Sequence, residues 1–195
     1  MKLSETYQNI FFRLINDAYQ TSMEEKRFKL DWDENDFSEL LNHYIRQNPV
    51  SIKHRIFCKT ENKNFNPNEE LEKGYADKLS RIDFVFSVFS KSERHEYFME
   101  AKNLKESSYS LKRRYIDTGI GNFKSKKYQN GNLIGYLLEG ETEKTIIGIN
   151  SLLNKYNRKT EILYPIQHKV IRNYFESNHS EIETLKHLIF DFTTI

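Results

Sequence analysis

Three side chains with the spacing of a reactive cluster lie between residues 81 and 104. Glu100 and Lys102 are two residues apart, so both project from one face of an extended strand, while Asp83 interrupts an apolar alternation in the preceding segment. If the polar residues 90–94 turn these two segments into a hairpin whose paired positions sum to about 183, Asp83 lies opposite Glu100. An aspartate, a glutamate and a lysine would then converge.

The chemistry that this cluster could perform follows from its charges. Two carboxylates within hydrogen-bonding range repel each other, so one must take up a proton or both must share a cation. Carboxylate oxygens, the backbone carbonyl of Ala101 and water would form the oxygen-rich shell that Mg²⁺ prefers. Beside such a site, the ammonium of Lys102 could orient a water or stabilise charge on a phosphate. The cluster therefore indicates a hydrolytic site with Mg²⁺ or Mn²⁺ as its cofactor.

The elements that must position this cluster predict a mixed fold of helices and strands. Apolar residues recur with helical spacing in some segments and alternate in others, and Gly or Pro residues separate several of them. In chain order we expect helices at 5–20 and 34–47, strands at 50–60, 81–89 and 95–104, two helices within 106–131 separated by a break at Gly119 and Gly121, a buried strand at 133–138, a helix at 142–156, and strands at 161–166, 169–176 and 185–192. The polar residues 61–78 are expected to form a long surface loop.

Length and composition fit one domain without a membrane segment. The 195 residues are 37% hydrophobic and 30% charged, with a net charge of +2, too small to indicate a nucleic-acid binder by itself. The single cysteine, Cys58, excludes an intramolecular disulfide, and the histidines lack the spacing of a zinc site. No apolar run approaches transmembrane length, and we expect a cytoplasmic protein.

A basic segment follows the reactive stretch. A run of cations is more often a solvated face than a binding surface, but this run begins directly after the predicted catalytic strand and is interleaved with tyrosines. It is therefore a candidate surface for phosphate groups of nucleic acid. The residues expected to contact nucleic acid are Lys105, Lys112, Arg113, Arg114, Lys124 and Tyr115.

Asp83 together with Glu100-Ala101-Lys102 resembles the active-site motif of the PD-(D/E)XK nuclease superfamily, which has the restriction endonuclease-like fold. The resemblance implies an α/β (α+β) fold with an αβββαβ core, in which a mixed central sheet is flanked by helices, here with additional C-terminal strands. It also implies that Asp83 and Glu100 bind the metal and that Lys102 assists phosphodiester hydrolysis. Many members use a further carboxylate from the helix before the sheet, and Glu39 matches that position. The proline that often precedes the aspartate is replaced by Ile82.

Residues 115–136 are similar to a motif of restriction-like nucleases from bacterial anti-phage defence systems. The matching positions are Tyr115-Ile116, Gly119-Ile120, Phe123, Tyr128 and Ile134-Gly135-Tyr136. This resemblance implies a DNA endonuclease in prokaryotic anti-phage defence, with RNA as the alternative substrate. A chain of this size has little room for a recognition domain, so we expect a homodimer or a larger sensor or ATPase partner.

The predicted domain spans residues 1–195, with a helical lead-in at 1–35, a catalytic core at 36–140 and a C-terminal helix with strands at 141–195. Two alternatives remain open. The chain could be a catalytically silent nuclease-fold subunit that binds nucleic acid or scaffolds a complex, or a small protein-interaction module whose charges only solvate its surface.

Overall fold

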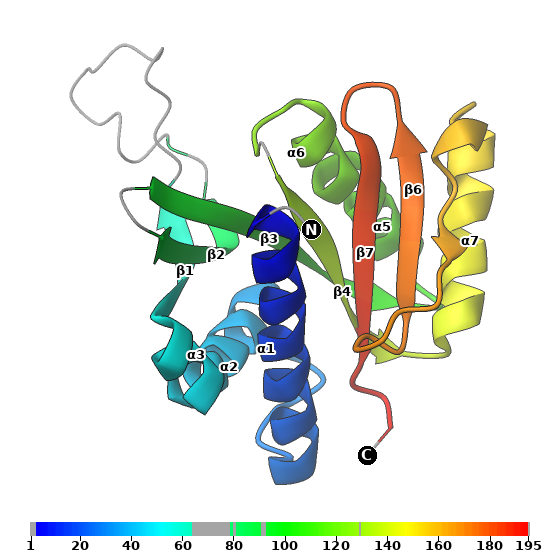
Figure 1. The fold of residues 1–195 in the computed structure, drawn as a ribbon. Coiled ribbons are helices and arrows are strands. Elements are labelled where there is room, and N and C mark those ends of the chain that lie inside the picture. Colours follow the sequence, from blue (N-terminus) through cyan, green and yellow to red (C-terminus); the bar gives the residue numbers. More distant parts are fainter. Residues whose placement is uncertain (1–2, 64–78, 80, 91–92, 129, 195) are drawn as a thin grey trace.

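The computed structural model describes residues 3–63, 79, 81–90, 93–128 and 130–194. Within these residues seven strands form one mixed sheet in the order β1-β2-β3-β4-β7-β6-β5, flanked by helices (Figure 1). The strands are β1 (Ile56–Lys63), β2 (Arg81–Ser90), β3 (Glu93–Lys105), β4 (Gly131–Glu139), β5 (Tyr164–Pro165), β6 (Tyr174–His179) and β7 (Glu183–Asp191). The pairs β3/β4 and β4/β7 are parallel and the other neighbours are antiparallel. The predicted mixed α/β class is confirmed.

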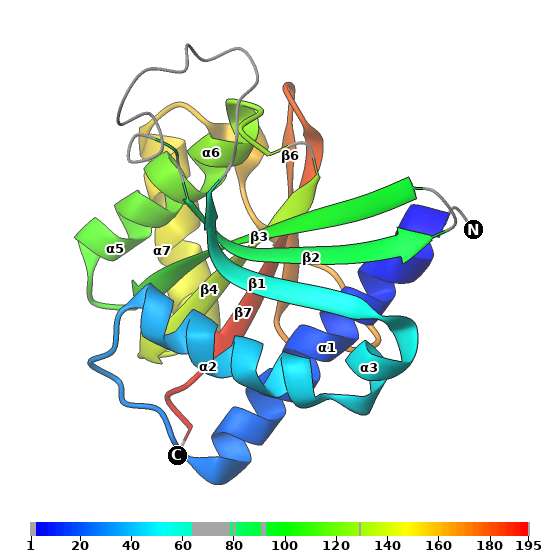
Figure 2. The same ribbon diagram turned by 90° about the vertical axis from the view of Figure 1, so that its left-hand side faces the viewer.

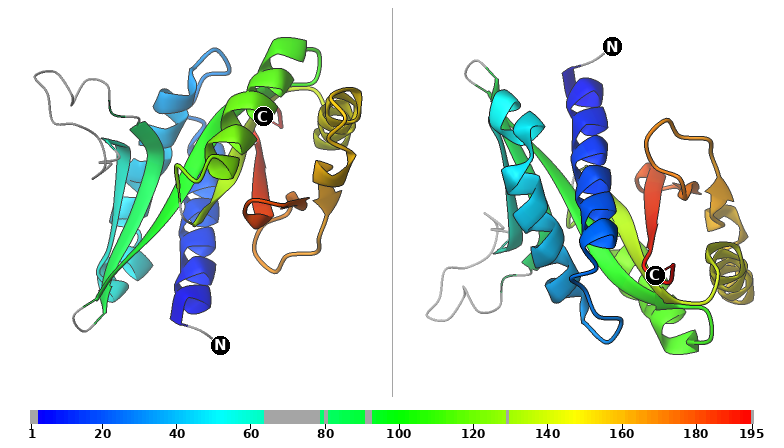
Figure 3. Two further views of the ribbon diagram at one scale, coloured as in Figure 1. Left: turned by 90° about the horizontal axis from the view of Figure 1, so that it is seen from above. Right: turned by 90° about the horizontal axis from the view of Figure 1, so that it is seen from below.

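The helices lie on both faces of the sheet. They are α1 (Leu3–Glu25), α2 (Glu34–Gln47), α3 (Pro49–His54), α5 (Tyr109–Arg114), the π-helix η1 (Tyr115–Ile120), α6 (Gly121–Lys124), α7 (Thr142–Lys155) and the 3₁₀-helix η2 (Lys159–Glu161). One apolar core joins α1 and α2 to the sheet, and a second core joins η1, α6 and α7 to the opposite face (Figure 2). Figure 3 shows α1 and α7 on opposite sides of β7.

The hairpin of β2 and β3 forms because its apolar residues alternate. Phe84, Phe86 and Val88 are buried in the core beneath α1 and α2, as a period of two requires. Phe84 pairs with Met99, so the paired positions sum to 183 as predicted. Continued by one residue, this register sets Asp83 opposite Glu100.

The segment expected to be a strand at 50–60 is in fact divided. Residues 49–54 form α3, because Asn48 accepts a hydrogen bond from the Val50 backbone at 2.9 Å and Pro49 occupies the first helical turn. Arg55, with φ of 51°, ends this helix in the left-handed region, and β1 begins at the next residue. The prediction was wrong for residues 50–55 and right for 56–60.

Two further expectations need correction. Residues 109–124 are helical throughout, so Gly119 and Gly121 do not break the helix; one lies inside the π-helix and the other begins α6. In the C-terminal third, residues 169–173 are not in a strand, and β5 covers two residues of the strand predicted at 161–166. Residues 61–63 extend β1, while the rest of the predicted 61–78 loop lies outside the described residues. None of the described helices is long and apolar enough to cross a membrane.

Candidate functional site

Asp83, Glu100 and Lys102 meet on the face of the sheet that also packs against η1 and α6. The Nζ atom of Lys102 lies 2.7 Å from Glu100 Oε1 and 3.9 Å from Asp83 Oδ2. It also donates to the backbone carbonyl of Ala101 at 2.6 Å, and the Ala101 backbone N–H donates to Asp83 Oδ2 at 2.6 Å. Lys102 therefore lies between the two carboxylates singled out from the sequence, and the three side chains come from two neighbouring antiparallel strands. We call them the carboxylate-lysine cluster.

Burial makes the two carboxylates of this cluster interact strongly. The side chains of Glu100 and Lys102 are each 6% exposed and that of Asp83 is 16% exposed. Loss of hydration and the nearby charge of Glu100 raise the pKa of Asp83 to about 7, although Lys102 and the Ala101 N–H oppose the shift. Such perturbed carboxyl groups are enriched at functional sites.

The donor set of the cluster fits a hard divalent cation. The Lys102 ammonium is bonded to Glu100 Oε1 and the Ala101 carbonyl, with Asp83 close by, so a positive charge already lies among oxygen ligands of the kind that Mg²⁺ prefers. No group of three or more His, Cys, Asp or Glu side chains able to hold a metal occurs in the part of the chain that the structure describes. Two carboxylates suffice for Mg²⁺ where substrate phosphate and water complete its shell.

The segment after β3 supplies two further contacts to Glu100, one from α6 and one from the residues that follow it. Asn122 Nδ2 donates to Glu100 Oε1 at 3.1 Å, and the Tyr128 hydroxyl donates to Oε2 at 3.3 Å. Gly119 allows this segment to approach, because a Cβ there would lie 3.0 Å from Leu133 and 3.5 Å from the Lys102 side chain. Sequence reasoning missed Asn122; its position one helical turn after Gly119 could have indicated it.

Glu39 is not brought into the cluster. It accepts hydrogen bonds from Thr60 on β1 at 2.5 Å and from Asn42 at 3.4 Å. The carboxylate of α2 whose charge acts on Asp83 is instead Glu34 at the start of the helix. Glu34 is 8% exposed and accepts hydrogen bonds from the Asn103 backbone at 2.9 Å and from Arg114 at 3.0 Å.

The basic segment is largely neutralised within the chain. Arg113 pairs with Asp117 at 2.9 Å, Arg114 with Glu34 at 2.9 Å, and Lys124 with Glu161 at 2.7 Å. Lys112 donates to the Glu106 carbonyl, and Lys105 is half-buried at the end of β3. Tyr115 was expected to contact nucleic acid, but it is fully buried and bonded to His187 at 2.9 Å, so this expectation was wrong.

A second buried polar cluster lies beneath β6 and β7. Its members are joined by Tyr115–His187 at 2.9 Å, His187–Ser177 at 2.7 Å, Ser177–His179 at 2.7 Å and His179–Glu161 at 2.8 Å. Burial alone would raise the pKa of Glu161, but Arg158, Lys124 and His179 together lower it to about 2, so Glu161 is ionised and can only accept. We call this series the Tyr115–Glu161 chain.

The hydrogen bonds of this chain all run in one direction. The His179 Nδ1–H donates to Glu161, so its Nε2 accepts from the Ser177 hydroxyl, and the Ser177 oxygen accepts from His187 Nε2–H. The His187 Nδ1 then accepts from the Tyr115 hydroxyl. Both imidazoles are neutral in this arrangement, and burial accordingly lowers the pKa of His187 to about 3. Ser177, His179 and Glu161 repeat the connectivity of a hydrolytic triad, but Ser177 is 0% exposed and cannot reach a substrate.

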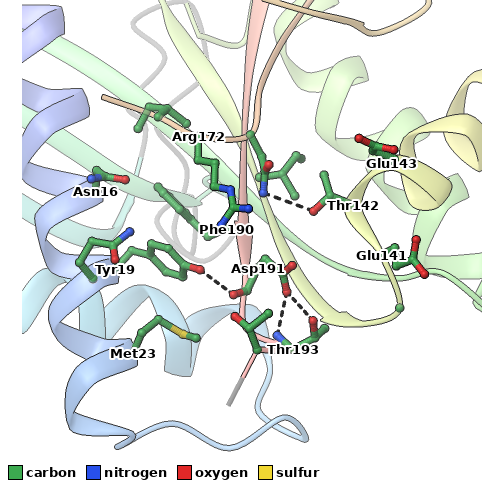
Figure 4. Close-up of a pocket in the computed structure, with 16 residues that line it drawn as sticks. Asn16, Tyr19, Met23, Glu141, Thr142, Glu143, Arg172, Phe190, Asp191 and Thr193 are labelled. Carbon is green, nitrogen blue, oxygen red and sulfur yellow. Dashed lines mark hydrogen bonds between the residues drawn. The ribbon is translucent and has the colours of Figure 1, made fainter. Parts of the chain in front are cut away.

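A separate pocket of 590 Å³ lies between α1, the start of α7 and the end of β7 (Figure 4). Its lining combines Arg172 with Asp191, Glu141 and Glu143, and the Tyr19 hydroxyl donates to the Asp191 carbonyl at 2.6 Å. Neither buried cluster contributes a residue to it. Opposite charges on its walls favour no single class of ligand.

Comparison with known proteins identified no relative. No family model matches the chain, and neither a curated protein nor a solved structure matches it.

Proposed function

We propose that the chain is a metal-dependent nuclease of the PD-(D/E)XK type. The observation that carries the proposal is the contact of Lys102 Nζ with Glu100 at 2.7 Å and its approach to Asp83 at 3.9 Å, all beside the Ala101 carbonyl. These oxygens and one ammonium are what phosphodiester hydrolysis requires: ligands for a cation, and a group that orients water or stabilises charge on phosphate. The order α2-α3-β1-β2-β3-helix-β4 also supports the proposal, because apart from the short α3 it follows the αβββαβ order that the resemblance implies.

Each residue has a defined role in this proposal. Asp83, Glu100 and the Ala101 carbonyl would hold Mg²⁺ or Mn²⁺, which supplies a water of lowered pKa and offsets negative charge on the scissile phosphate. Lys102 would exchange its bonds to Glu100 and Ala101 for contacts to water or phosphate. Asn122 and Tyr128 would keep the Glu100 carboxylate in place. Glu39 could serve as an outer ligand only through water, since it is bonded to Thr60.

The proposed substrate is DNA, and the proposed setting is prokaryotic anti-phage defence. Both rest on the resemblance of the residues around Asp83, Glu100 and Lys102 and of residues 115–136 to nucleases of such systems. A homodimer or a larger sensor or ATPase partner would supply the recognition for which this chain has little room.

The test is cleavage of plasmid, linear and single-stranded DNA and of RNA with Mg²⁺ or a chelator. We expect Lys102→Met and Asp83→Asn to lower the rate by at least about 100-fold, the usual effect of losing a proton-transfer or charge-stabilising group. Lys155→Met, which removes an exposed lysine from the end of α7, is the matched control. Equal rates for Lys102→Met and wild type would refute the proposal.

One observation favours a catalytically silent nuclease-fold subunit as the second candidate. The Lys102 ammonium already compensates the charge of Glu100, which is 5% exposed. Calorimetric titration with Mn²⁺ separates the two functions. Binding that is lost in Asp83→Asn supports the nuclease, whereas no binding at millimolar metal supports the silent subunit.

A further inference from the structure

Two phenylalanine side chains are exposed side by side near the turn end of the β2/β3 hairpin. Phe57 on β1 is 56% exposed and Phe89 on β2 is 63% exposed. Their ring centroids are 6.4 Å apart, with an interplanar angle of 79°. Large apolar side chains that cluster on a surface commonly mark a binding site, because their exposure to water is unfavourable.

This aromatic pair shares a sheet face with the carboxylate-lysine cluster. Phe89 and Asp83 are both odd-numbered positions of β2, and Phe57 pairs with Ser87, another odd-numbered position. A strand rises about 3.3 Å per residue, so Ser87, the partner of Phe57, lies roughly 13 Å from Asp83 along β2, and Phe89 lies roughly 20 Å from Asp83. An extended ligand bound at the cluster could therefore reach both rings.

The chain around Phe57 is basic and contains no acid. Residues 40–60 include no Asp or Glu, and their lysines and arginines are Arg46, Lys53, Arg55 and Lys59. All four are exposed, and within the described part of the chain none forms an ion pair or a side-chain hydrogen bond. A groove of 390 Å³ beside Phe57 is lined by Arg46, Arg55 and Ile52 among others. On the other side, Arg94 lies directly across from Phe89 in the ladder, but it is ion-paired with Glu96.

These cations differ from those that the sequence pattern singled out. Arg113, Arg114 and Lys124 are each paired with a carboxylate, so a phosphate would have to displace an existing partner. The four cations of residues 40–60 have no such partner among the described residues, so a phosphate bound there would release only their small counterions, which favours binding. A surface with unpaired cations therefore lies next to Phe57.

We infer that Phe57 and Phe89, with Lys59 and with the Arg46 and Arg55 that line the groove beside Phe57, bind unpaired bases and the flanking phosphates of single-stranded nucleic acid. This inference rests on the proposed nuclease function and specifies its substrate class. Aromatic rings interleaved with cations are the usual means of binding single strands, because every base has a face that stacks and every nucleotide carries a phosphate. A protein partner is the less favoured occupant, since residues 40–60, which border Phe57, carry four cations and no acid and so suit a polyanion better than a mixed surface.

The test measures affinity for a fluorescent single-stranded oligonucleotide and for the matching duplex, with a chelator present so that no cleavage occurs. We expect Phe57→Ala and Phe89→Ala each to weaken single-strand binding by about 5- to 150-fold, the effect of losing one stacked base. Phe57→Trp should restore the affinity, because it keeps a stacking face. Ile147→Ala, at an apolar α7 side chain that is 65% exposed, is the matched control and should leave binding unchanged.

The salt dependence supplies a second readout. Replacing Arg55 and Lys59 with glutamine should flatten the slope of log affinity against log salt by about 0.7 for each phosphate that the variant no longer neutralises. Replacing Arg113 and Arg114 should leave the slope nearly unchanged. The inference is overturned if the phenylalanine variants bind as wild type, if duplex binds as well as single strand, or if these variants instead abolish self-association and leave nucleic-acid affinity intact. If the protein binds single strands in a manner that depends on Phe57 but cleaves no nucleic acid, this inference is supported and the proposed nuclease function is refuted.

Discussion

The carboxylate-lysine cluster and the Tyr115–Glu161 chain are both buried, but their hydrogen-bonding groups are balanced differently. In the Tyr115–Glu161 chain every hydrogen-bond donor faces an acceptor. The series runs from the Tyr115 hydroxyl to the ionised Glu161, which Lys124 and Arg158 also contact. In the cluster two carboxylates share one ammonium, and the pKa of Asp83 is raised to about 7 by burial and by Glu100. One arrangement is satisfied, whereas the other stores electrostatic repulsion.

Such a difference is expected between a structural polar network and a site that binds a ligand. A satisfied buried network rigidifies the fold and has no remaining affinity for a ligand. A site that holds like charges close together is stabilised by any cation that enters it, so its unfavourable energy becomes binding energy. The Tyr115–Glu161 chain contains the connectivity of a hydrolytic triad, yet the carboxylate-lysine cluster is the better candidate for chemistry.

Removing a hydrogen-bonding side chain from the Tyr115–Glu161 chain should produce the largest loss of stability. His187→Phe leaves the buried Tyr115 hydroxyl without its acceptor and the Ser177 oxygen without its donor, although the Ser177 hydroxyl still donates to His179. We expect a cost of about 1–3 kcal/mol in the free energy of unfolding for each of these two unsatisfied groups. Urea denaturation measures this change. His43→Phe, at an exposed position on α2, should change stability little, and equal effects of the two substitutions would contradict a structural role for the chain.

Repulsion between the two carboxylates of the carboxylate-lysine cluster should make the free energy of unfolding depend on pH. The pKa of Asp83 rises from 3.8 to about 7 on folding, so between these values the folded state holds a proton that the unfolded state has lost. The free energy of unfolding should therefore fall as pH rises from about 4 to about 7, by up to about 4 kcal/mol, and level off above that range. Thermal unfolding with a chelator at each pH measures this effect.

The matched variant is Asp83→Asn, which keeps an acceptor for the Ala101 N–H but carries no charge. It should remove this part of the pH dependence and be more stable than wild type at pH values above about 7. Parallel stability curves for the two proteins would show that Asp83 is ionised without penalty and that the cluster is as balanced as the chain.

The smallest effect is expected at the edge of the cluster. The Tyr128 hydroxyl donates to Glu100 at 3.3 Å and to the Arg81 carbonyl at 3.2 Å, and both bonds are long. Tyr128→Phe should therefore lower stability by about 1 kcal/mol and the proposed cleavage rate by less than about tenfold, since Asn122 still contacts Glu100. Tyr156→Phe, at a partly exposed position bonded to Tyr109, is the control. A large loss of activity would place Tyr128 within the reactive group itself.

Local sequence patterns were sufficient to predict the β2/β3 hairpin and the convergence of its three charged residues. A period of two assigns each side chain to a face, and one register then sets Asp83 opposite Glu100. The same local reasoning located α2, the buried central strand β4 and α7, because their apolar patterns are strong and uninterrupted. It failed at residues 50–55, where the cap at Asn48 and Pro49 outweighs the alternation.

Which polar side chains are free to bind a ligand depends on long-range packing and could not be read from local patterns. The charge of Glu34, not that of Glu39, raises the pKa of Asp83, and Tyr115 is buried in the core. Arg113, Arg114 and Lys124 are each paired with a carboxylate, and for Arg114 and Lys124 this carboxylate comes from a distant element. In the Tyr115–Glu161 chain, His179 on β6 and His187 on β7 are joined through Ser177. Partners of this kind come from segments far apart in the sequence, and local periodicity carries no information about which of them will meet.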